Sequence, residues 1–149
     1  METNRKQDLV EIQELFNALS KNAALDWGKH DETGLSLNQV FILEILANEG
    51  NKRPSDLAET LQITTGGITG LSQRLLEGAL IQKVSDQHDR RVAHLEITEQ
   101  GQRALQIALL QREKMMDRLF GTLSDEDIAY LLRIGRSLLD RTHLETGEE

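Results

Sequence analysis

The sequence predicts a mainly α-helical protein that carries one short β-hairpin. Proline occurs only once in the 149 residues, so long helices are not interrupted. Apolar residues recur at spacings of three and four over most of the chain, which is the helical period. Two short segments rich in β-forming residues flank a polar run of six residues, as in a hairpin. The expected order of elements is therefore α-α-α-α-β-β-α-α.

A single apolar stripe predicts a first helix of about 20 residues. Gly28 and the polar run 29–34 are expected to end this helix. Ser36 can cap the second helix, and Gly50-Asn51 stops it. The first stripe comprises Leu9, Ile12, Phe16, Leu19, Ala23 and Trp27, and the second comprises Leu37, Phe41, Ile45 and Leu46.

The third and fourth helices are short and separated by a tight connection. Pro54 fits the first turn of the third helix, whose inner face is Leu57, Ala58 and Leu61. Thr64 or Thr65 can cap the fourth helix, which is expected to run to about Glu77. Its inward face comprises Ile68, Leu71 and Leu75, and its outward face comprises Gly66, Thr69, Gly70 and Gln73.

The remaining chain predicts a hairpin followed by two long helices. Strands are expected at 80–85 and 92–97, joined by the polar tip 86–91. The next helix ends at Gly121, and Ser124 with three following acidic residues caps the last helix. Three short helices followed by a two-stranded wing make a winged helix-turn-helix, here residues 36–101.

The terminal segments, 1–35 and 102–149, are expected to form a helical dimerisation region. Their apolar stripes are too extensive for one small core, and the simplest partner is the same stripe on a second copy. A monomeric helical bundle is the alternative. The sequence therefore predicts a homodimer built from its two ends.

Composition argues against several classes of protein. The chain has no cysteine, which excludes disulfides, thiolate nucleophiles and zinc fingers and fits a reducing cytoplasm. It has neither a secretion signal nor an apolar stretch of the roughly 20 residues that cross a bilayer. The four histidines, His30, His88, His94 and His143, lack metal-ligand spacing, and Gly66-Gly67 lacks the lysine of a phosphate loop. We expect a cytoplasmic protein with no membrane partner, metal, cofactor or enzymatic activity.

The formal charge of −8 is unusual for a DNA-binding protein. Acidic residues gather outside the expected DNA-reading segment, at 125–127 and at Glu145, Glu148 and Glu149. Between residues 62 and 98, four basic residues balance four acidic ones. We therefore expect modest, salt-sensitive DNA affinity that depends on a few arginines. A winged helix that serves only protein contacts is the alternative.

In a helix-turn-helix the second helix enters the major groove, which assigns DNA reading to the 65–77 segment. Thr69 offers a hydroxyl and a methyl group to a base edge, and Gln73 can pair with adenine. Three glycines, Gly66, Gly67 and Gly70, each cost a helix about 1 kcal/mol relative to alanine. Either the bare backbone approaches DNA closely, or this stretch is a loop.

Charged residues next to the reading face can hold the DNA backbone and the minor groove. Arg74 flanks the fourth helix, where it can meet a phosphate or pair with Glu77. At the hairpin tip, the Asp89 carboxylate can hold the Arg91 guanidinium extended for a narrow minor groove. A solvated turn is the alternative for Arg90 and Arg91.

The run from Leu37 to Gly101 resembles the MarR (multiple antibiotic resistance regulator) family of bacterial transcription factors. The matching pieces are Leu57-Ala58 with Leu61, Thr65-Gly66-Gly67-Ile68-Thr69, Arg74-Leu75, the tip Asp86–Arg91 ending in Asp-Arg-Arg, and Leu95-Glu96-Ile97-Thr98-Glu99-Gln100-Gly101. The resemblance implies a homodimeric repressor that binds a pseudo-palindromic double-stranded DNA operator. It also implies that Thr65, Thr69 and Gly70 face bases, Arg74 meets phosphate, and Arg91 enters the minor groove held by Asp89.

The resemblance further implies a small aromatic or anionic effector that binds between the dimer helices and the DNA-binding domain. Trp27, Lys29 and His30 are the candidates, with a core tryptophan and two solvated side chains as the alternative. Two positions depart from the family pattern. Glycine stands at Gly78 rather than at Ala79, which predicts a different exit from the fourth helix, and Gly70 replaces a residue that is often large.

Overall fold

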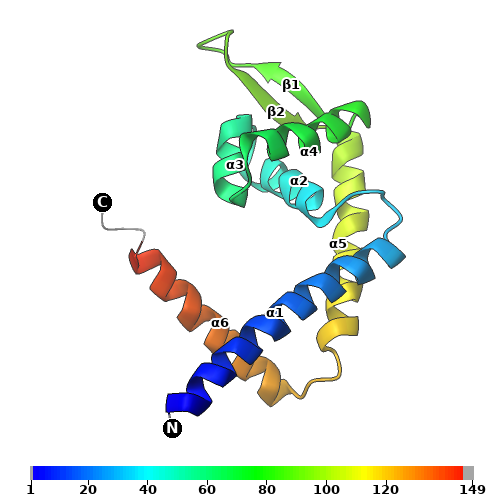
Figure 1. Cartoon of the computed structure of the whole chain (residues 1–149). Helices are drawn as coiled ribbons and strands as arrows, with labels where there is room; N and C mark the ends of the chain where they lie inside the picture. The colour runs from blue at the N-terminus through cyan, green and yellow to red at the C-terminus, as the bar shows by residue number, and fades with distance from the viewer. Residues whose placement is uncertain (1, 146–149) are drawn as a thin grey trace. The chain divides into compact units, whose positions relative to one another are not determined.

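The computed structural model describes residues 2–145, and side chains are described for 4–141. The elements are α1 (Glu2–His30), α2 (Leu37–Glu49), α3 (Pro54–Leu61), α4 (Thr65–Glu77), β1 (Ile81–Ser85), β2 (Ala93–Ile97), α5 (Glu99–Phe120) and α6 (Asp125–Glu145) (Figure 1). The predicted order of elements is thus confirmed. The side chain of His143, the far end of the expected dimerisation region and the acidic residues Glu148 and Glu149 lie outside the described residues.

The chain divides into two compact units, one up to Glu113 and one from Lys114 onwards. The first unit holds α1 to α4, the hairpin and most of α5. The second holds the end of α5 and all of α6. Helix α5 therefore runs through the boundary, and the winged helix-turn-helix lies entirely within the first unit.

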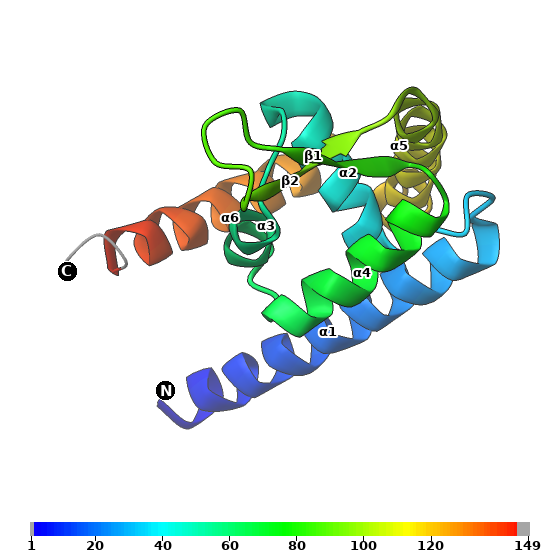
Figure 2. The same cartoon turned by 90° about the horizontal axis from the view of Figure 1, so that it is seen from above.

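The core of the first unit lies between α2, α3, α4 and the hairpin, which Figure 2 shows grouped together. Ile68 and Leu75 of α4 are fully buried and Leu71 is half-buried, which confirms the predicted inward face. Each fully buried aliphatic side chain contributes about 1.5–3 kcal/mol. The fully buried side chains are Val40, Ile42, Leu43, Leu57, Ile68 and Leu75, with Leu46, Ile81 and Leu95 almost as buried.

The predicted apolar face of α2 was right only in part: Leu46 is buried and Leu37 and Ile45 are half-buried, but Phe41 is not. Phe41 is 40% exposed, whereas Val40, Ile42 and Leu43 are completely buried. Helix α2 contacts both α4 and β2, so more than one of its sides is buried. A helix that is apolar on most of its circumference has no single stripe from which the sequence could select the inner face.

The hairpin is antiparallel, with Ile81 opposite Ile97 and Lys83 opposite Leu95. Both strands begin one residue later than predicted, because Leu80 and Val92 belong to turns in which their N–H groups bind Leu75 O and Asp89 O. Lys52 adds a short antiparallel bridge, with Lys52 N donating to Leu95 O (3.2 Å) and Leu95 N to Lys52 O (2.7 Å). This bridge, which the sequence did not indicate, ties the segment before α3 to the wing.

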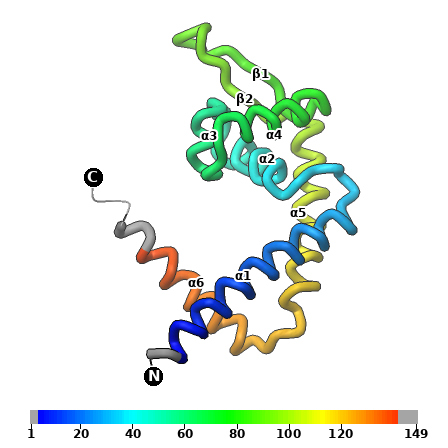
Figure 3. The backbone as a smooth tube through the Cα atoms, in the orientation of Figure 1, coloured from blue at the N-terminus to red at the C-terminus, as the bar shows by residue number. Residues whose placement is uncertain are grey.

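Helix α1 is longer than predicted, with 29 residues in an unbroken path (Figure 3). Gly28 does not end it, because the helical hydrogen bonding continues to Asp31 N, which donates to Trp27 O (2.8 Å). The helix stops where the Asp31 carboxylate accepts from Thr33 N (2.9 Å). Along its length, the apolar side chains of Leu9, Ile12, Phe16 and Leu19 are exposed.

Helix α6 begins at the predicted cap. Ser124 Oγ accepts from Asp127 N (3.1 Å), as expected of an N-cap followed by acidic residues. Apart from the half-buried Ile128, the large apolar side chains described in this helix are exposed, namely Tyr130, Leu131, Leu132, Ile134, Leu138 and Leu139. Among the described helices, none combines the length and apolar character that crossing a bilayer requires.

Candidate nucleic-acid interface

Helix α4 is held at its start and middle by side chains that the sequence only partly indicated. Of the two proposed caps, Thr64 is the N-cap, and its Oγ1 accepts from Gly67 N (3.1 Å). Gln62 closes the preceding helix in the left-handed conformation (φ 53°). Gln39 of α2 is 2% exposed and its Nε2 donates to Leu71 O (3.4 Å). Helix α4, the candidate recognition helix, is therefore anchored to α2 through a buried amide.

The predicted outward face of α4 is confirmed as exposed. Thr65, Gly66, Thr69, Gly70 and Gln73 are all solvent-accessible along this helix. Thr69 Oγ1 donates to Thr65 O (3.0 Å), which leaves its oxygen lone pairs able to accept from a base. Gln73 Nε2 donates to Glu77 Oε1 (3.1 Å), which engages one of its two amide hydrogens and leaves the other hydrogen and Oε1 available to a base.

The glycines of α4 fall into two kinds. A Cβ at Gly67 would lie 2.5 Å from Ile63 Cγ2, so packing within the chain requires this glycine. A Cβ at Gly66 or Gly70 would meet nothing within 4 Å. Because α4 is one continuous helix, the loop alternative for this stretch is wrong. The chain itself gives no steric reason for bare backbone at Gly66 and Gly70.

The exit from α4 places a left-handed residue at Ala79 (φ 55°), while Gly78 has φ −78°. The left-handed position of this turn, which favours glycine, is therefore occupied by Ala79 and not by Gly78. Thr98 Oγ1 donates to Ala79 O (2.7 Å) and Thr98 N donates to Leu80 O (3.0 Å), which holds the turn against the start of α5. A hydrogen-bonded framework thus supports a conformation that alanine disfavours.

Arg74 lies exposed on the flank of the outward face. Its predicted alternative partner, Glu77, is bonded to Gln73 instead. Among the residues whose side chains the structure describes, no carboxylate lies within ion-pair distance of Arg74. The guanidinium is therefore uncommitted and able to meet a phosphate.

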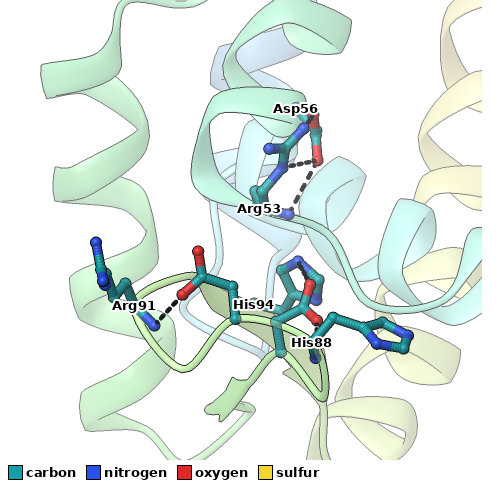
Figure 4. Close-up of polar contacts among 7 residues, drawn as sticks. Arg53, Asp56, His88, Arg91 and His94 are labelled. Atoms are coloured by element: carbon teal, nitrogen blue, oxygen red, sulfur yellow. Dashed lines mark hydrogen bonds and ion pairs between the residues drawn. The ribbon is translucent and has the colours of Figure 1, made fainter.

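The wing tip differs from its expected geometry. Asp89 Oδ1 accepts from the backbone N of Arg91 (3.0 Å) rather than from its guanidinium, which extends away from this contact (Figure 4). Asp86 Oδ1 likewise accepts from His88 N (2.7 Å), and this bond lowers the pKa of Asp86. An aspartate readily binds the N–H two residues ahead, which shapes a tight turn. Asp89 therefore positions the backbone beneath Arg91 and not the guanidinium itself.

Sequence reasoning missed a charged cluster where α3 begins. Arg53 Nε donates to Asp56 Oδ2 (3.2 Å), and the Arg53 backbone N donates to the same oxygen (3.2 Å) (Figure 4). These bonds lower the pKa of Asp56 and raise that of Arg53. On the wing, His94 Nε2 lies 3.5 Å from Asp86 Oδ2. The sequence feature that could have indicated this cluster is the arginine immediately before Pro54, the first residue of α3.

The three effector candidates are not brought together as a binding group. Trp27 is 5% exposed and its indole N–H donates to Leu35 O (2.7 Å), as the core alternative expected. Lys29 is exposed, and His30 is exposed with Nδ1 at 2.9 Å from Asp26 O. Trp27 therefore offers a ligand neither a free donor nor an open ring face. Within the described part of the chain, no three acidic or histidine side chains cluster as metal ligands.

Comparison with known proteins finds one family whose model matches residues 35–93, described as the MarR family. The chain is 25% identical over 130 residues to the uncharacterized HTH-type transcriptional regulator YpoP of Bacillus subtilis, covering 87% of this chain and 92% of YpoP. It is 27% identical over 119 residues to the HTH-type transcriptional repressor MdtR of the same organism, covering 80% and 76%.

The same fold is found in the solved structure of Bordetella bronchiseptica BpsR, a protein whose DNA binding is regulated by 6-hydroxynicotinic acid. It superposes with a TM-score of 0.75 at 18% identity, covering 86% of this chain and 98% of that one. At this identity the likeness concerns the fold alone. It agrees with the winged-helix architecture described above.

Proposed function

We propose that the chain is a winged-helix transcriptional regulator of the MarR family that binds double-stranded DNA as a homodimer on a pseudo-palindromic operator. The observation that carries the proposal is the outward face of α4. Its residues are small and polar, and two of its glycines have no packing role within the chain. A helix normally carries long charged side chains on such a face, so bare backbone here fits close approach to a groove.

In this proposal α4 lies in the major groove and the wing follows the adjacent minor groove. Thr65, Gly66, Thr69, Gly70 and Gln73 lie against base edges. Three arginines supply positive charge. Arg74 contacts a phosphate, and Arg90 and Arg91, with Asp89 beside them, lie at the minor groove. The exposure of these side chains and the free guanidinium of Arg74 support this assignment.

The second copy of the chain covers the apolar faces of the terminal helices. Exposed apolar patches larger than a few hundred Å² usually mark interaction surfaces. Helix α1 exposes Leu9, Val10, Ile12, Leu15, Phe16 and Leu19, and α6 carries the exposed residues described above. Two-fold symmetry then presents two recognition helices to two half-sites of one operator.

We further propose that DNA binding represses transcription. A small aromatic or anionic effector controls this binding. The relative MdtR is a repressor by name, and the fold neighbour BpsR is regulated by 6-hydroxynicotinic acid. Differential affinity of such a molecule for two dimer shapes would shift DNA binding. Lys29 and His30 are the exposed candidates for its polar groups, whereas the third candidate, Trp27, is buried. A thermal-shift screen of phenolic and pyridine carboxylic acids tests this part, with a uniform lack of response counting against it.

Fluorescence anisotropy with random-sequence duplex DNA tests the binding itself. Binding at roughly 50 mM salt that weakens strongly by roughly 200 mM is expected, because arginine–phosphate contacts release counterions. Arg74→Ala should weaken binding to all duplexes alike, whereas Arg103→Ala on α5 should have little effect. The rival function is a winged helix that contacts only proteins, which the net charge of −8 favours. The absence of binding at both salt concentrations would support that rival.

A further inference from the structure

Helix α5 is attached to the recognition helix near its first turn. The contacts of Thr98 with Ala79 O and Leu80 O lie immediately before α5 begins. A Cβ at Gly101 would lie 2.0 Å from Leu80 O, so α5 packs directly against the backbone that follows α4. The end of the recognition helix therefore follows any movement of the start of α5.

The same helix is attached to α2 by an ion pair between Arg112 and Glu44. Arg112 Nη1 lies 2.8 Å from Glu44 Oε2, and Nη2 lies 2.8 Å from Glu44 Oε1. Both side chains are about three-quarters buried, with exposed fractions of 26% and 28%. The Arg112 guanidinium also lies 5.6 Å from the centre of the Phe41 ring. This bidentate geometry fixes direction as well as distance, because both groups are planar.

Two further contacts make this junction more than one isolated ion pair. Next to Arg112, the Gln111 amide satisfies its neighbours when its nitrogen is assigned to the side facing Asp31: it then donates to Asp31 Oδ1 (3.0 Å) and accepts from Glu32 N (3.1 Å), which ties α5 to the loop after α1. On the other side, α2 carries the Gln39 amide that bonds Leu71 O of α4. The chain of contacts thus runs from α5 through α2 to the middle of the recognition helix.

We propose that the Glu44–Arg112 pair positions the recognition helix, by fixing the angle between α5 and the α2–α4 pair and thereby the separation of the two recognition helices in the dimer. The inference rests on the proposed function, since it needs two copies on one operator. The pair is only partly removed from solvent, so the Coulombic attraction is largely offset by the cost of desolvation and its net contribution to folding stability is modest. Its effect should therefore appear in geometry and operator selectivity more than in melting temperature.

A distance measurement between the two copies tests the proposal without DNA. The chain has no cysteine, so Glu77→Cys gives one spin-label site per copy, at the end of α4. Double electron–electron resonance should give a narrow distance distribution in this background, and a broader or displaced one when Arg112→Lys or Glu44→Gln is added. The exchanged pair Glu44→Arg with Arg112→Glu should restore a narrower distribution.

Arg103→Lys is the matched control, because Arg103 forms an exposed ion pair with Glu99 on the same helix at 3.8 Å. It should leave the distribution unchanged. Identical distributions in Arg112→Lys, Glu44→Gln and the background would overturn the positioning role. The absence of any distance between copies in the background itself would instead overturn the proposed homodimer, and the positioning role with it.

Operator selectivity gives a second readout. On a duplex selected by the wild-type protein, inserting two base pairs between the half-sites should weaken wild-type binding strongly. In Arg112→Lys this discrimination should fall by about twofold to thirtyfold, the range typical of residues that couple distant sites. A purely structural role would lower affinity for both duplexes equally, which would refute the proposal.

Discussion

Replacing Gly70 with alanine should move folding stability and DNA affinity in opposite directions. The added Cβ meets nothing within 4 Å in the free protein, and position 70 lies well inside α4. Alanine should therefore stabilise the helix by about 1 kcal/mol, the ordinary difference between glycine and alanine in a helix interior. For a chain of this size that corresponds to a melting temperature higher by roughly 2–4 °C.

The same methyl group should obstruct DNA, because the outward face of α4 is the surface assigned to the major groove. Holding the helix away from the base edges should weaken one set of specific contacts, by about 1–3 kcal/mol. This corresponds to a loss of roughly fivefold to 150-fold in affinity for the selected operator. Affinity for random duplex should change less, because phosphate contacts dominate that binding.

Differential scanning calorimetry and operator titration of the same preparation measure both effects. Gly28→Ala is the matched control, since Gly28 is also an exposed helical glycine with open space around it and lies on α1, outside the DNA-binding domain. It should leave operator affinity unchanged. A stabilised Gly70→Ala that binds the operator as tightly as the wild type would refute the close-approach argument. A destabilised one would refute the steric argument.

Four further predictions follow from the described contacts. Arg91→Ala should weaken operator binding by about 1–3 kcal/mol and reduce any preference for A/T-rich flanks, as measured by anisotropy; unchanged affinity would remove Arg91 from the minor groove. Ala79→Gly should stabilise the fold by about 1–2 kcal/mol in chemical denaturation, because Ala79 has φ 55°, whereas Gly78→Ala at φ −78° should bring no comparable change; equal effects would contradict the backbone argument. Phe16→Glu should shift sedimentation from dimer towards monomer, because Phe16 is 61% exposed on the α1 stripe; a monomeric wild type would count against that surface. The bonds from Arg112 lower the pKa of Glu44 below its ordinary 4.5, so the stability of this pair should be present above that pH and lost as pH falls through the lowered pKa. Melting curves of Glu44→Gln should depend less on pH in this acid range, and parallel curves would contradict the assignment.

The elements that the sequence predicted well are those whose signals are local. Ser36, Thr64 and Ser124 act as caps because a hydroxyl before a helix satisfies a backbone N–H whatever the rest of the chain does. The outward face of α4 followed from helical geometry, because Ile68 and Leu75 had to pack inward. Local geometry therefore sufficed to place most of the candidate interface.

The errors arose where tertiary contacts decide the outcome. Helix α2 is apolar on several sides, so only its neighbours determine that Phe41 is exposed and Ile42 is buried. Asp89 and Arg91 are two positions apart in the sequence. This spacing alone does not show whether the Asp89 carboxylate accepts from the Arg91 guanidinium or from the Arg91 backbone N–H. The Glu44–Arg112 pair joins residues 68 positions apart, a contact that periodicity cannot reveal.

Selection of duplexes from a fully randomised pool, followed by sequencing, tests the central claim most directly. The proposed homodimer would present two copies of α4 to one DNA molecule, so the enriched sequences should contain an inverted repeat. Its half-site centres should lie about 10 base pairs apart, or a multiple of this, because each copy of α4 reads one turn of the major groove. Enrichment of an unrepeated site, or of no sequence at low salt, would contradict the account.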